Sequence, residues 1–95
     1  MTPHEYQARL QALLAKRGIH VAPQSMASPY GLVGGITPGL ILSIDLDPGG
    51  VYAQILTTDP GDMPLEQVGF VEDTAPKYVC QQIAQLCRPY RKAKP

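Results

Sequence analysis

The segment LILSIDLDPGGVYAQILTT, residues 40–58, carries the pattern that decides the fold. Every second residue from Leu40 to Leu46 is aliphatic, with Ile41, Ser43 and Asp45 between them, and this period of two is typical of a half-buried strand. Pro48-Gly49-Gly50 has the composition of a turn, and residues 51–58 are rich in β-forming side chains. The segment therefore predicts two antiparallel strands joined by a short hairpin.

Helices are indicated on either side of these strands. Thr2, Pro3 and Glu5 form a capping-box pattern, and apolar residues at helical spacing follow, so we predict a helix over 3–17 that ends at Gly18. A second helix is predicted to begin after Asp73 or Thr74 and to end near Arg88, because Pro89 follows it.

A third strand is predicted from Leu65 to Glu72, after a turn at 59–62. Residues 20–39 contain three prolines and four glycines. This segment is interpreted as a long loop, within which 30–36 could form a weak fourth strand.

The predicted fold class is α+β, in the order α-β-β-β-α. We expect a three-stranded antiparallel sheet, or a four-stranded one, with both amphipathic helices on one face. Residues 1–90 are predicted to form a single domain, and residues 91–95 a short basic tail.

Charge is strongly segregated along a chain whose formal net charge is zero. Residues 41–73 contain seven acids and no Lys or Arg, whereas residues 74–95 contain five bases and no acid. If both helices cover one face of the sheet, the other face is open and carries Ser43, Asp45 and Asp47. It also receives either Tyr52, Gln54 and Leu56 or their neighbours on the same strand.

Motifs for catalysis or cofactor binding are not found, and we expect a non-enzyme without metal or cofactor. Asp45 to Gly50 resembles the opening of a calcium loop, but Gly49 and Leu56 stand where two ligands are needed. The His and Cys spacing fits no zinc site, although a Cys80–His20 nucleophile pair stays open. Cys80 and Cys87 are about 10.5 Å apart along a helix, too far for a disulfide, and are expected to be buried thiols.

The sequence also shows no pattern typical of a membrane span or a signal peptide. No run approaches the roughly 20 apolar residues that span a bilayer, and the first residues do not resemble a signal peptide. The expected location is the cytoplasm, and no membrane partner is expected.

The preferred hypothesis is a small protein-binding module that inhibits or regulates a partner with a basic surface. Its candidate binding residues lie on the acidic strands, in their turns and in the 20–39 segment: Asp45, Asp47, Tyr52, Asp59, Asp62, Glu66 and Tyr30. A homodimer through the free sheet face or an edge strand stays open.

The alternative hypothesis is a nucleic-acid-binding accessory protein that uses its basic C-terminal segment. Its candidate residues are Arg88, Tyr90, Arg91, Lys92 and Lys94, which would bind phosphates and stack on bases. The acidic middle of the chain argues against this reading.

Size and the absence of motifs carry one further expectation. Compact α+β proteins of this kind are typical of inhibitors that phages and mobile elements direct against host machinery, including anti-CRISPR proteins. This expectation rests on these two features alone and assigns no role to any particular residue.

Overall fold

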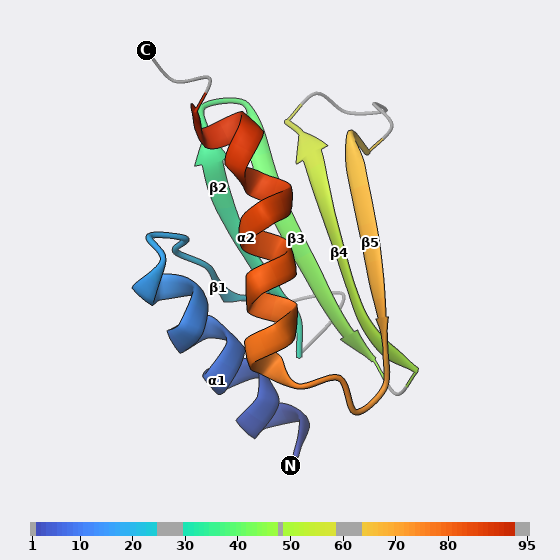
Figure 1. The fold of residues 1–95 in the computed structure, drawn as a ribbon. Helices are drawn as coiled ribbons and strands as arrows, with labels where there is room; N and C mark the ends of the chain where they lie inside the picture. The colour runs from blue at the N-terminus through green and yellow to red at the C-terminus, as the bar shows by residue number, and fades with distance from the viewer. Residues whose placement is uncertain (1, 25–29, 48, 59–63, 93–95) are drawn as a thin grey trace.

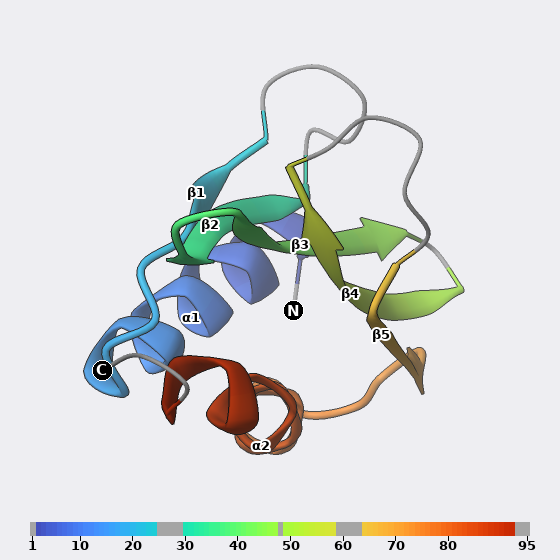
Figure 2. The same cartoon turned by 90° about the horizontal axis from the view of Figure 1, so that it is seen from above.

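The computed structural model describes residues 2–24, 30–47, 49–58 and 64–92 and contains two helices and one sheet. In chain order the elements are α1 (Pro3–Lys16), β1 (Ala22–Pro23), β2 (Leu32–Thr37), β3 (Leu40–Asp47), β4 (Gly50–Thr57), β5 (Glu66–Val71) and α2 (Pro76–Lys92). The strands form one antiparallel sheet in the order β1-β2-β3-β4-β5. Both helices lie on the same face of this sheet, which confirms the α+β class (Figures 1 and 2).

The sheet has five strands, so the prediction of three or four strands was wrong in number. Strand β2 corresponds to the weak fourth strand that the sequence left open at 30–36, and β1 is additional, at 22–23 in the part of the 20–39 segment for which no strand was predicted. Gly34 shows why: a Cβ at this position would lie 2.2 Å from the carbonyl oxygen of His20. Glycine at this position lets the neighbouring backbone approach β2. Glycines normally weaken a strand, so their presence in the sequence argued against the strand that they in fact permit.

The core lies between the sheet and the helices, and every second residue of the central strands points into it. In β3 and β4, alternate residues are buried, and the helices add their apolar stripes. The largest of its fully buried side chains are Leu10, Leu14, Leu32, Leu42, Ile44, Ile55, Val79, Ile83 and Cys87. Each buried aliphatic side chain contributes about 1.5–3 kcal/mol through the area it removes from water.

Helix α1 begins and ends as its sequence predicts. The Thr2 hydroxyl accepts the Glu5 N–H, and the Glu5 carboxylate accepts the Thr2 N–H, which completes the capping box. At the other end Gly18 has φ +80°, and the N–H of Ile19 donates to the carbonyl of Leu14. This pairing is a Schellman motif, and it turns the buried Ile19 back onto the helix.

Helix α2 continues past Pro89 to Lys92, so the prediction that it ends near Arg88 was wrong. A proline inside a helix removes one backbone hydrogen bond. Side-chain contacts on its last turn offset that loss. Tyr90 packs against the core and its hydroxyl donates to Glu66 Oε2 at 3.1 Å, while Arg91 donates to the carbonyls of Arg17 and Gly18 at 3.1 and 3.4 Å.

The hairpin between β3 and β4 generates a stability prediction. Asp47 is in register with Gly50, whose φ is +144°, and a Cβ on Gly50 would lie 2.0 Å from the carbonyl oxygen of Phe70. Gly50→Ala is therefore expected to lower the free energy of unfolding by about 3 kcal/mol.

The matched control is Gly35→Ala, because a Cβ there would have no neighbour within 4 Å. We expect it to change stability by less than about 0.5 kcal/mol. Urea unfolding of both variants measures the difference, and equal midpoints would contradict the close approach of β5 to Gly50.

Candidate functional site

The sheet face turned away from the helices is the candidate site, and burial decides which residues form it. Val51, Ala53 and Ile55 of β4 are buried, so Tyr52, Gln54 and Leu56 take the opposite face. The register then pairs Tyr52 with Asp45. Of the two alternatives for β4, the structure therefore shows the one with Tyr52, Gln54 and Leu56 turned away from the helices. We call the sheet face that carries them the open face.

Tyr52 is the best-fixed exposed aromatic group on the open face. Its hydroxyl donates to Gln67 Oε1 on β5. Its ring lies over Gly69, where a Cβ would be 3.4 Å from Tyr52 Cδ1. Gly69 has no side chain to cover the ring, and Tyr52 remains 38% exposed. This is the arrangement of a preorganised aromatic contact residue.

Asp45 and Asp47 supply charge beside this ring. Asp45 is opposite Tyr52 in the register, and Asp47 Oδ1 accepts the N–H of Gly49 at 3.1 Å, which orients the carboxylate at the hairpin. Neither β3 nor any other strand contains a Lys or Arg. The carboxylates of the open face therefore have no counter-charge on their own layer.

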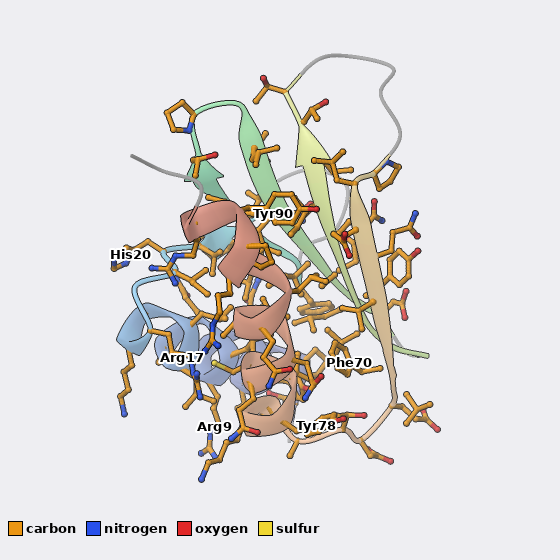
Figure 3. All side chains as sticks on the ribbon, turned by 45° about the horizontal axis from the view of Figure 1, so that its top comes forward. Arg9, Arg17, His20, Phe70, Tyr78 and Tyr90 are labelled. Atoms are coloured by element: carbon orange, nitrogen blue, oxygen red, sulfur yellow. The ribbon has the colours of Figure 1, made fainter. Side chains whose placement is uncertain are left out.

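The cations whose side chains the structure describes lie in the other layer of the molecule. Arg9 and Lys16 lie on α1, Arg17 caps it, and Lys77 and Arg88 lie exposed on α2. In Figure 3, Arg9 and Arg17 lie on the helical side. The fold thus places Asp45 and Asp47 on the sheet face that is turned away from these cations.

The structure brings together three of the predicted partner-binding residues, namely Asp45, Asp47 and Tyr52. Glu66 is placed on the helix side of β5, where it accepts a hydrogen bond from Tyr90. Tyr30 packs against the core and meets the His4 ring edge-on, with centroids 4.9 Å apart. Asp59 and Asp62 lie outside the described residues.

Sequence reasoning missed the contribution of β2 and β5 to the open face. Val33 of β2 is paired with Ser43, and Gln67 and Gly69 of β5 flank Tyr52. The alternation of Val68 and Phe70 with Gln67 and Gly69 was the available signal for β5. In β2, Gly34 and Gly35 interrupt the alternation of apolar and polar residues, so no such signal was available.

A cavity of about 640 Å³ lies at the hairpin end of the sheet, on the side of the helices and between the sheet and the start of each helix. Leu46, Val51 and Val71 form part of its apolar wall, and Asp47 joins it to the open face. The Tyr6 hydroxyl at this cavity donates to the carbonyl of Thr74 at 2.6 Å, and burial raises the Tyr6 pKa. Its proton is therefore held in a structural bond.

Two members of the predicted nucleic-acid set have structural partners. Tyr90 is half-buried and bonded to Glu66, and Arg91 bonds to the end of α1. Arg88 is exposed, while the side chain of Lys92 and all of Lys94 lie outside the described part of the chain. The set therefore does not form one free basic surface within the described residues.

The thiols and possible metal ligands were also located. Cys80 and Cys87 are free and buried, as predicted. Burial raises the pKa of Cys80, an effect that Arg17 opposes in part, and His20 is exposed. Within residues 2–24, 30–47, 49–58 and 64–92, no three His, Cys, Asp or Glu side chains are grouped to hold a metal ion. Nor does any described helix have the length and apolarity to cross a membrane.

Comparison with known proteins gives no relative: no family model, curated protein or solved structure matches the chain.

Arg91 generates a prediction that separates a structural role from nucleic-acid binding. Arg91→Ala is expected to lower the free energy of unfolding by about 1 kcal/mol, because it removes two charge-assisted hydrogen bonds from the end of α1. Arg88→Ala on the same helix serves as the control and should change stability by less than about 0.5 kcal/mol. Thermal unfolding at equal protein concentration compares them, and equal effects would exclude this bond as a stabilising contact.

The buried thiols generate a prediction about pH. Burial raises the pKa of Cys87 from 9.0 to about 11, so the folded protein keeps its proton where the unfolded chain loses it. The resulting stabilisation is complete below pH 9 and is lost as pH rises from 9 to 11. Cys87→Ala should remove that part of the pH dependence, as measured by urea unfolding at several pH values. A variant with an unchanged alkaline slope would contradict it.

Proposed function

We propose that this protein is a non-enzymatic binding module whose open face binds the basic surface of a protein partner and thereby inhibits or regulates that partner. The observation that carries the proposal is the fixed Tyr52 ring beside Asp45, on a sheet layer without any Lys or Arg.

The composition of the open face fits a protein interface. The exposed Tyr52 lies between Asp45 on one neighbouring strand and Gln67 and Gly69 on the other, toward the carboxylates at the hairpin, and the aliphatic side chains of Val33, Ile41 and Leu56 occupy other parts of the same face. Interfaces place an aromatic anchor within such a mixed rim, and the ordered Tyr52 loses little conformational freedom on binding.

Charge defines the kind of partner. Uncompensated carboxylates attract Lys and Arg side chains, accelerate their encounter and make association sensitive to salt. The same carboxylates repel a phosphate backbone lying across the face. Nucleic acid would have to contact the helical layer, where Arg91 and Tyr90 are already engaged. That the partner belongs to host machinery attacked by a mobile element stays a prediction from chain size.

The proposal is tested by removing charge from the open face. The partner is first isolated on the tagged protein from a nuclease-treated lysate, and its affinity is then measured by titration calorimetry. Asp45→Asn with Asp47→Asn is expected to weaken binding at least about tenfold, or 1.4 kcal/mol. Asparagine at 47 retains the oxygen that accepts the Gly49 N–H, so the hairpin is preserved.

The matched control adds the same two units of net charge to the opposite layer, as Gln81→Lys with Gln85→Lys on α2. We expect this variant to bind like the unaltered protein. If the two double variants lose affinity equally, net charge and not the open face is responsible. If nuclease removes all binding and Arg88→Gln abolishes it, the nucleic-acid alternative replaces the proposal.

A further inference from the structure

The two edges of the sheet are built differently. At one edge β1 has only two residues, and Pro23 has no N–H to offer a further strand. The backbone of His20 also approaches β2 closely at Gly34. At the other edge, β5 runs for six residues without a Lys or Pro, and no strand of the described residues lies on its outer side. Such an edge is a template for another strand.

Two exposed aliphatic side chains, Leu65 and Val71, flank this same edge strand. They belong to the five large apolar side chains that are exposed among the described residues, of which Val33 lies near the opposite edge: Val33, Tyr52, Leu65, Val71 and Tyr78. Leu65 precedes β5 and is 47% exposed, and its N–H donates to the carbonyl of Ile55 on β4. Val71 ends β5 and is 76% exposed. The unpaired edge therefore has an accessible aliphatic group at each end.

Symmetry restricts how β5 could pair with a second copy of itself. An antiparallel pair of identical strands requires a two-fold axis perpendicular to the sheet, and this axis passes beside one residue that faces its own copy. Two registers pair five residues of β5, one centred on Val68 and one on Gly69. In the register centred on Gly69, Glu66 stands opposite Glu72 twice, and like charges placed opposite one another destabilise a pair.

The register centred on Val68 has no such conflict. It places Leu65 of each copy opposite Val71 of the other, so both exposed aliphatic groups gain a partner. Glu66 then stands opposite Phe70, and no acid of β5 opposes another acid. Because the chain has zero formal net charge, no long-range repulsion separates the copies.

We propose that the occupant of the β5 edge is a second copy of this chain, paired antiparallel about Val68 to form a two-fold homodimer with a continuous ten-stranded sheet. The helices of both copies lie on one face of that sheet, and both open faces lie on the other. This goes beyond the proposed function, since the open face is complete within one copy.

Cross-linking tests the register directly. Leu65→Cys and Val71→Cys are prepared as chains of different length, mixed, and oxidised with glutathione disulfide. A heterodimeric band is expected to form at least about tenfold faster than either homodimeric band, because only the mixed pair is opposed. Val68→Cys is expected to cross-link with itself. The native thiols give no background, since Cys80 and Cys87 are buried.

Val33→Cys is the control for Leu65→Cys and Val71→Cys, because Val33 lies on the open face near the opposite edge of the sheet, whereas Val68 faces the helices. The proposal is overturned if Val33→Cys cross-links with itself as fast as Leu65→Cys does with Val71→Cys, or if mixing Leu65→Cys with Val71→Cys gives no preference for the heterodimer.

Sedimentation equilibrium provides a second, independent measurement without cysteine substitutions. The unaltered chain and Val33→Lys are expected to dimerise, whereas Val71→Lys should weaken dimerisation about tenfold by removing two cross-strand pairs. A chain that stays monomeric at about 1 mM overturns the dimer. Salt distinguishes the two proposals. Added salt screens the negative charges of Glu66 and Glu72 and so preserves self-association, whereas it weakens the attraction between the open face and a basic partner.

Discussion

The contact of the two helices with one row of aliphatic side chains on the central strands is the interaction on which the rest of the structure depends. Leu42 and Ile44 of β3 and Ala53 and Ile55 of β4 are sealed by this contact. Because successive side chains of a strand point to opposite faces, burial of this row forces Ser43, Asp45, Tyr52 and Gln54 outward. Core formation and the exposure of the open face are thus one event, and a one-residue register slip would destroy both.

The same constraint separates the charges. Both helices turn an apolar stripe toward the sheet, so their described cations lie on one side of the molecule while Asp45 and Asp47 of β3 lie on the other. A protein with zero net charge therefore presents two surfaces that repel different partners. Net charge alone would predict no preference at all, whereas its distribution favours a basic partner for one layer.

Local patterns were sufficient to predict the parts of the fold that depend on local chemistry. The capping box at Thr2, the left-handed Gly18 and the hairpin at Asp47 follow from residue types within a few positions of one another. The elements that were mispredicted depend on distant partners. Gly34 marks a strand only because His20 approaches it, and α2 passes Pro89 only because Tyr90 and Arg91 reach β5 and α1. The candidate site divides in the same way: alternation places Asp45 outward, but the ring of Tyr52 is fixed by Gln67 and Gly69 on another strand.

The position of α2 after the sheet has a consequence for synthesis of the protein. Ile55 leaves the ribosome 32 residues before Cys87, the last member of the buried row on α2. At ordinary rates of translation that interval lasts roughly 2–6 s. During this interval only α1 can cover the aliphatic row of β3 and β4. The nascent chain therefore exposes apolar surface to which chaperones or neighbouring chains can bind. Yield in the cell is therefore governed by how quickly α2 follows as well as by the stability of the finished fold.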